Sequence, residues 1–221
     1  MSVLIVFIQK AIVQGICILY GALGEIMTEK SGNLNLGIPG IMYMGGISGL
    51  MGAFLYEKDN PDPNALVGVL ISFLCAFACA AIGGLIYSIL TITLRVNQNV
   101  TGLALTIFGT GFGNFFGGSL IKLVDSDVPS ITLTATSGFF SKTLPFAGKL
   151  GWFGKLFLSY GFLAHLPILL ALLSSYFLKH TRVGLHLRAV GESASTADAA
   201  ASNVTQYQYL ANYIGRMTAS L

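Results

Sequence analysis

The chain has 221 residues, of which 54% are hydrophobic and only 10% are charged, and its net charge is +3 at neutral pH. A soluble globular domain carries about 25% charged residues, so this chain has too few charges to cover a surface that faces water. The small, scattered positive charge gives no indication of nucleic-acid binding, whereas the apolar composition predicts an all-α bundle of helices that span a lipid bilayer.

The apolar stretches predict about five membrane-spanning helices, because each span needs about 20 mostly apolar residues. They lie at residues 3–23, 34–56, 65–94, 100–121 and 156–178. A polar connection is expected at 25–33, between the first two spans. A last segment, 207–221, contains Arg216 and is too short to be predicted as a span.

The second stretch is interrupted by polar and helix-breaking residues. Asn33, Asn35 and Pro39 stand with several glycines where a helix should enter the bilayer. Proline removes a backbone donor, and freed backbone groups are tolerated in hydrocarbon only where protein or a water-filled cavity satisfies them. We therefore expect a broken second helix that faces the protein interior. The alternative is a short loop followed by a kinked ordinary helix.

Glycines recur every four residues in the fourth stretch, at Gly109, Gly113 and Gly117, and again at Gly45 and Gly49. This spacing places the glycines on one helix face, where they let two helices approach closely in lipid. The pattern predicts packed contacts between helices.

The basic residues give a weak indication of orientation. Five spans place equal numbers on the two sides, with Lys30, Arg95, Lys179, Arg182 and Arg188 on one side and Lys58, Lys122, Lys142, Lys149 and Lys155 on the other. Three of the first group lie close to a helix end, which counts more than lysines spread along a long loop. We expect residues 179–205 to be cytoplasmic and the N-terminus to be outside.

A second unusual stretch runs through residues 183–204. Gly191 ends one segment, and Ser193 is a plausible N-cap for a short helix of small residues. Such a helix has little side-chain bulk and fits a groove of another protein. The alternative is a solvated connecting helix without a partner.

Three stretches of the sequence resemble the membrane permeases of ABC importers for branched-chain amino acids, simple sugars and nucleosides, most closely the nucleoside and simple-sugar branch. The first includes Glu25, Thr28, Glu29, Ser31, Gly32, Leu34, Asn35, Leu36, Gly37, Gly40 and Met42; the second is residues 97–105; the third includes Gly184, Leu187, Arg188, Ala189, Val190, Gly191, Glu192, Ala199, Ala200 and Asn203. The chain departs from the pattern at Pro39 and Ser193, and members of the group continue through further helices after the third stretch.

The resemblance implies a single transmembrane permease domain over residues 1–221, incomplete relative to the family, in the cytoplasmic membrane of the cell. It also implies a second permease subunit, an extracytoplasmic solute-binding protein and a cytoplasmic ATPase as partners. The ATPase would dock on residues 181–205, which we name the coupling segment. The residues expected to couple to it are Gly184, Leu187, Arg188, Ala189, Gly191, Glu192, Ser193, Ala197, Ala200 and Asn203.

The sequence contains no phosphate-binding loop, since Ser141, Lys142 and Thr143 lack the preceding glycine that this motif requires. We therefore expect a transport subunit without catalytic residues or a cofactor, with ATP hydrolysed by the partner. Cys75 and Cys79 have no histidine or acidic residue nearby, so a metal site is not predicted.

Uncharged polar side chains in or beside the spans are candidates for lining a pathway, because a neutral polar cargo needs donors and acceptors without fixed charge. They are Asn33, Asn35, Asn97, Gln98, Thr101 and Asn114. Hydrogen bonding between helices is the alternative for each. Two other functions stay open: a secondary transporter or channel, which would need acidic residues within the spans, and a truncated membrane subunit that does not transport.

Overall fold

The computed structural model describes residues 2–123, 133, 135–142 and 159–221, and no strand occurs among them. The all-α prediction is confirmed. The helices are α1 (Ser2–Glu29), α2 (Ile38–Asp59), α3 (Ala65–Ser88), α4 (Gln98–Leu123), α5 (Ala135–Phe140), α7 (Phe162–His180), α8 (Arg182–Glu192), α9 (Ala194–Ala199) and α10 (Val204–Ala219). A π-helical turn, η1 (Ile89–Thr93), continues α3.

Five of these helices are long and apolar enough to cross a membrane: α1, α2, α3 with η1, α4 and α7. The predicted number of spans is confirmed, and the chain is a multi-pass membrane protein. Large apolar side chains such as Phe7, Ile107 and Leu172 are exposed on the outside of the bundle. Because lipid rather than water surrounds these faces, their exposure needs no covering layer.

The first helix is longer than predicted. It continues to Glu29, so Glu25 and Glu29 lie in its last turns and not in a polar connection. Glu25 is held there because its carboxylate accepts a hydrogen bond from the backbone of the following segment. The predicted stretch 3–23 contains no acidic residue, but the helix itself extends far enough to include two.

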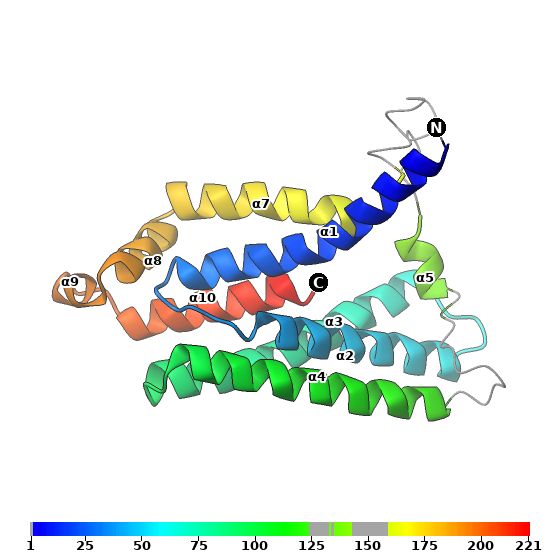
Figure 1. The fold of residues 1–221 in the computed structure, drawn as a ribbon, viewed down its shortest axis with the longest axis horizontal. Helices are drawn as coiled ribbons and strands as arrows, with labels where there is room; N and C mark the ends of the chain where they lie inside the picture. The colour runs from blue at the N-terminus through cyan, green and yellow to red at the C-terminus, as the bar shows by residue number, and fades with distance from the viewer. Residues whose placement is uncertain (1, 124–132, 134, 143–158) are drawn as a thin grey trace.

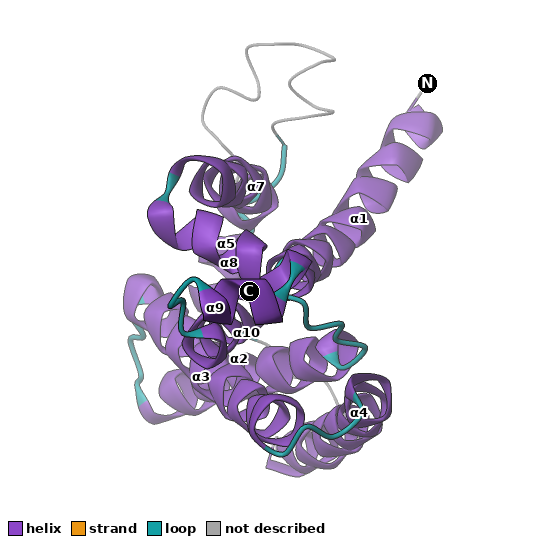
Figure 2. Cartoon of the chain, turned by 90° about the vertical axis from the view of Figure 1, so that its left-hand side faces the viewer, coloured by secondary structure: helices purple, strands orange, loops and turns teal. Residues whose placement is uncertain are grey.

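The chain runs back and forth along the long axis of the molecule (Figure 1). One end of the bundle, which we name the motif end, contains the end of α1, the starts of α2 and α4, η1, and helices α8 and α9. The N-terminus and α5 lie at the opposite end. Figure 2 shows that the first half of α1 projects away from the other helices.

Helix α10, the segment too short to be predicted as a span, lies at the centre of the bundle. It runs between α1 and the α2–α3 pair (Figure 1) and contacts all three helices. One face, which includes Ala211, Asn212, Gly215 and Arg216, is fully buried. Its asparagine and arginine lower the hydropathy of the segment, which is why composition failed to single it out.

The second helix has no break at Pro39, in contrast to the prediction. Pro39 lies in the first turn of α2, where its missing N–H would have no partner in the helix in any case. The helix then continues without interruption to Asp59. The irregular backbone comes earlier, at residues 33–37, which we name the linker.

The glycines of the fourth helix make the predicted close contact. A methyl group built on Gly109 would lie 2.6 Å from the Cα of Gly40, so the backbones of α2 and α4 touch at this point. Gly113 accommodates the ring of Tyr43 on the next turn. On the other side of α2, Gly49 lies against Ser72 of α3. The close approach of α2 to both neighbours therefore depends on small residues.

Candidate functional site

The three sequence motifs, far apart along the chain, meet at the motif end of the bundle (Figure 1). The turn before the linker touches α8, and the linker is hydrogen-bonded to the start of α4. The candidate functional site is therefore the linker together with the coupling segment. The site consists of direct contacts between backbone segments and of side chains that form hydrogen bonds with backbone groups.

The linker belongs to no helix or strand. Side chains from three helices form hydrogen bonds with its backbone. The amide of Asn35 donates to the carboxylate of Glu25 in α1, with 3.0 Å between N and Oε1. The hydroxyl of Tyr87 in α3 donates to the carbonyl of Leu34 at 2.6 Å. The hydroxyl of Thr106 in α4 donates to the carbonyl of Leu36 at 2.8 Å. These bonds satisfy the backbone of a non-helical segment in which Asn33, Asn35 and Gly37 are buried while Leu34 and Leu36 are exposed.

Gln98, at the start of α4, binds the linker with both ends of its amide. Its Oε1 accepts from the Leu34 amide, and its Nε2 donates to Oδ1 of Asn33, both at 3.0 Å. Asn35 turns its own Oδ1 onto the amide of Gly37 at 2.9 Å. Asn33 is 1% exposed and Asn35 is 2% exposed, so both side-chain amides are buried and their hydrogen bonds stabilise the linker.

The coupling segment touches the α1–α2 turn through a glycine. Gly191 near the end of α8 lies against the backbone of Lys30 and Gly32, and a methyl group built on it would be 3.1 Å from the Gly32 amide nitrogen. Gly32 has a φ of +83°, which only glycine adopts readily. The two glycines therefore bring two backbone segments together without any side chain between them.

The predicted coupling residues divide into two groups. Gly184, Leu187 and Ala197 are buried against the bundle, and Leu187 has no exposed surface. The others are half-buried or exposed and available to another protein, namely Arg188, Ala189, Gly191, Glu192, Ser193, Ala200 and Asn203. The short helix of small residues expected after Gly191 is confirmed as α9, and α8 ends at Glu192, one residue beyond the predicted end at Gly191.

Two of these residues cap helices, and the sequence predicted the first of these caps. Ser193 caps α9 as predicted, because its hydroxyl accepts from the Thr196 amide. Asn203 caps α10 in the same way, accepting from the Gln206 amide at 3.2 Å. In addition, Nδ1 of His186 in α8 lies 3.0 Å from the hydroxyl oxygen of Ser202, which precedes α10. The segment therefore holds a defined shape at the end of the bundle.

The candidate pathway residues are not gathered in one place. Asn33, Asn35 and Gln98 belong to the linker site. Asn97 caps α4 by accepting from the Asn99 and Val100 amides, and Thr101 is bonded to the Asn97 carbonyl. Asn114 lies farther along α4 and accepts from the Tyr43 hydroxyl at 3.1 Å. Asn35 borders a groove of about 590 Å³ between α1 and α2, and Thr101 borders a separate one between α3 and α4.

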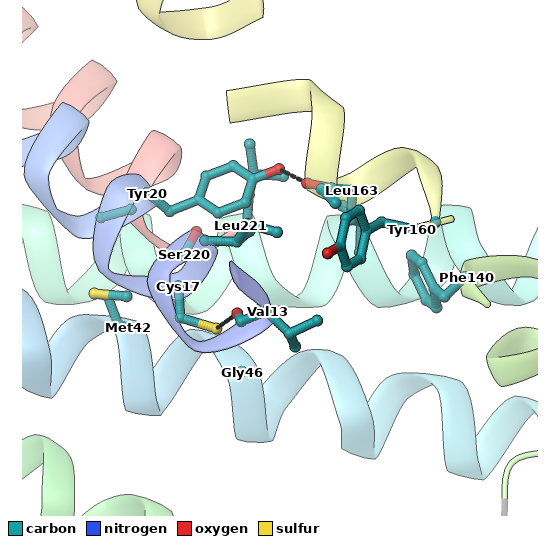
Figure 3. Close-up of a pocket in the computed structure, with 14 residues that line it drawn as sticks. Val13, Cys17, Tyr20, Met42, Gly46, Phe140, Tyr160, Leu163, Ser220 and Leu221 are labelled. Carbon is teal, nitrogen blue, oxygen red and sulfur yellow. Dashed lines mark hydrogen bonds between the residues drawn. The ribbon is translucent and has the colours of Figure 1, made fainter. Parts of the chain in front are cut away.

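A further cavity of about 380 Å³ lies at the C-terminal end of α10 (Figure 3). Its walls are mostly apolar and include Tyr20, whose hydroxyl donates to the Leu163 carbonyl at 2.9 Å. Tyr160 also borders it, and its buried hydroxyl has no hydrogen-bond partner within the described residues. The predicted pathway residues do not border this cavity.

Sequence reasoning missed the polar cluster around Arg216. This side chain is 0% exposed, and its Nη1 donates to the Gly84 carbonyl at 3.0 Å. Its guanidinium lies 4.1 Å from the centre of the Tyr87 ring, a cation–π arrangement. Asn212 donates to the Ser88 hydroxyl beside it. A charge within an apolar segment was the available signal, since such residues usually face the interior of a bundle.

Tyr87 joins this cluster to the linker, and its hydroxyl is expected to matter for stability. We expect Tyr87→Phe to destabilise the fold by about 1–3 kcal/mol, because the Leu34 carbonyl loses its donor. Unfolding in detergent micelles, followed by circular dichroism, measures this cost. Tyr176→Phe is the control, since Tyr176 is 63% exposed. An equal loss in both variants would contradict a specific role for the Leu34 bond.

The helical bundle, with its linker and its protruding coupling segment, is that of a multi-pass membrane protein. Over residues 7–221 the chain matches the family described as the permease component of the branched-chain amino acid transport system. The chain belongs to this family, which confirms the resemblance seen in the three motifs.

Individual relatives agree with this assignment. The chain is 27% identical over its whole length to the guanosine ABC transporter permease protein of Bacillus subtilis. It is 26% identical, over 92% of its length, to a nucleoside ABC transporter permease protein of Lactococcus lactis. It is 30% identical, over 90% of its length, to a putative glucose ABC transporter permease protein of Haloferax volcanii. The matches cover 65%, 61% and 55% of these relatives, and no solved structure matches the chain.

Proposed function

We propose that the chain is a membrane-embedded permease subunit of an ATP-driven importer, with nucleosides or simple sugars as cargo. Family membership over residues 7–221 supports the permease role. The relatives described above, which are named as guanosine, nucleoside and glucose transporter permeases, support this class of cargo. The partners are a cytoplasmic ATPase, a second permease subunit and an extracytoplasmic binding protein, and the location is the cytoplasmic membrane.

The observation that carries the proposal is the position of the coupling segment. Helices α8 and α9 stand at the motif end, beyond the ends of the spanning helices (Figure 1). Exposed residues of several kinds, including Leu185, Arg188 and Ala200, cover their outer face. The basic residues Lys30, Arg95, Lys179 and Arg182 lie at or beside helix ends of the same side, which favours a cytoplasmic motif end. An ATPase docked there would act on the linker indirectly, through the contact of α8 with the turn that precedes it.

Co-purification with a candidate ATPase tests this docking. We expect Ala200→Trp to weaken the association at least about tenfold, because a bulky ring on a small exposed residue prevents close fit. Asp62→Trp, exposed at the opposite end, is the control and should bind normally. Normal binding by the Ala200 variant and by a chain lacking α9 would overturn the docking role.

Cysteine labelling tests the orientation separately. In a chain without its three native cysteines, a cysteine at Ser195 should react only with reagents applied from the cytoplasm, and one at Asp62 only from outside. The reverse result would place the coupling segment beyond the reach of any cytoplasmic ATPase. Uptake of labelled guanosine, ribose and leucine by the assembled transporter then selects the cargo. Uptake of leucine alone would contradict a nucleoside or sugar cargo.

A further inference from the structure

The contact between α8 and the α1–α2 turn is made by backbone atoms. A methyl group on Gly191 would collide with Lys30 and would lie 3.1 Å from the Gly32 nitrogen; one on Gly32 would lie 3.4 Å from the Gly191 Cα. Flexible side chains can absorb a small displacement by changing rotamer, but backbone segments in direct contact cannot. A shift of the end of α8 toward the turn must therefore move residues 30–32.

The turn passes this shift to the linker, which follows it directly along the chain. From the linker, two kinds of contact reach α4. Gly102 packs against the backbone, since a methyl group on it would be 2.8 Å from the Leu36 nitrogen. Gln98 makes its two 3.0 Å hydrogen bonds to Asn33 and Leu34. Packing transmits a displacement only when the linker moves toward α4. A pair of hydrogen bonds also resists a movement of the linker away from α4.

The bond to Leu34 is exposed, whereas the surroundings strengthen the partly buried bond to Asn33. Asn33 is 1% exposed, and the Leu34 carbonyl is already engaged by the Tyr87 hydroxyl at 2.6 Å. A hydrogen bond in a low-dielectric interior is stronger than in water, and breaking it there leaves polar groups without partners. The amide of Gln98 therefore fixes the start of α4 to the first two residues of the linker.

We propose that Gln98 is a positioning residue that transmits displacement of the coupling segment, through the turn at 30–32 and the linker, to the start of α4. The inference rests on the proposed docking of an ATPase on α8 and α9, for which it supplies a route into the bundle. Its two steps are the Gly191–Gly32 contact and the Gln98 bonds to Asn33 and Leu34.

Amide hydrogen exchange on the purified full-length chain tests the route without any ATPase. Gly191→Ala displaces the turn, and we expect it to raise the exchange rates of Leu34 and Asn35, and of Thr101 in the first turn of α4, by about tenfold. In a background of Gln98→Met, which has no amide, the same substitution should still affect Leu34 but should raise the Thr101 rate much less, because the Gly102 packing and the Thr106 bond to Leu36 remain while both Gln98 bonds are lost.

Two further variants separate transmission from general loosening. Gly184→Ala also forces α8 away from a backbone contact, but from α7 at Phe177 and Leu178, so it should not alter exchange at Thr101. Gln98→Glu should retain transmission, because its carboxylate accepts from the Leu34 amide and, once the Asn33 amide turns over to exchange Oδ1 for Nδ2, from Asn33, whose Nδ2 has no partner within the described residues.

The outcomes are distinct from those of the docking experiment. A response at Thr101 to both glycine substitutions, or a response of undiminished size in Gln98→Met, would overturn the role of Gln98 while leaving ATPase docking untouched. Conversely, normal ATPase binding by the Ala200 variant and by the chain lacking α9, together with the expected exchange response, would overturn the docking role and not the mechanical route.

Discussion

Replacing Arg216 with alanine is expected to destabilise the bundle by about 3–5 kcal/mol, the upper range for removing a large buried side chain. The side chain is 0% exposed, and its stem packs against Gly84, where a methyl group would lie 3.0 Å from the Arg216 Cδ. Alanine would leave a cavity between α10 and α3 at the centre of the molecule. Unfolding in detergent micelles measures the loss.

Arg216→Met separates packing from charge. Methionine fills most of the stem volume, and the partners of the guanidinium keep other bonds: Ser88 still accepts from Asn212, and the Gly84 carbonyl lies within α3. Removing a buried charge also removes its desolvation cost. We therefore expect Arg216→Met to remain within about 1 kcal/mol of the unmodified chain. If methionine were as damaging as alanine, the interactions of the guanidinium rather than the packing of its stem would hold α10 in place.

Gly109→Leu is expected to separate α2 from α4 at a cost of about 3 kcal/mol, the upper end of the usual cost of overpacking. The backbones touch in both directions at this crossing: a methyl group on Gly40 would also lie 2.6 Å from the Thr106 Cα. In lipid, helix association depends on such packing because there is no hydrophobic drive between apolar surfaces. Loss of cross-linking between cysteines introduced on α2 and α4 reports the separation.

Gly111→Leu is the matched control on the same helix. No atom lies within 4 Å of a methyl group built on Gly111. We expect this variant to change stability by less than about 0.5 kcal/mol, or to stabilise α4 slightly through better helix propensity. Equal damage from the two leucines would show that α4 tolerates no bulk anywhere and would remove the special role of the Gly40–Gly109 crossing.

These two predictions concern two different contacts between helices of the bundle. Gly109 sets the distance between α2 and α4, while Arg216 fixes α10 against α3. Tyr87 connects the linker to Arg216, since it contacts Arg216 with its ring and Leu34 with its hydroxyl. Variants of either residue should therefore be checked for altered exchange at Leu34 before a change in transport is attributed to the coupling segment.

The sequence by itself determined the five spanning helices, the glycine contacts of α2 and α4, and the Ser193 cap. Each of these depends on local chemistry: an apolar stretch partitions into lipid whatever its neighbours are, and a capping side chain bonds an amide three residues away. The family resemblance was equally visible, because its three motifs are short and contiguous.

Only the tertiary structure decided which polar residues are interior. Arg216 made α10 look unlike a spanning helix, yet its partners Gly84 and Ser88 lie more than 120 residues earlier in the chain. The same holds for Glu25, Gln98 and Tyr87, which together satisfy a linker that sequence reasoning placed inside a broken helix. The burial of a polar group is stable only when its partners are present, and those partners are brought together by the packing of helices distant in sequence.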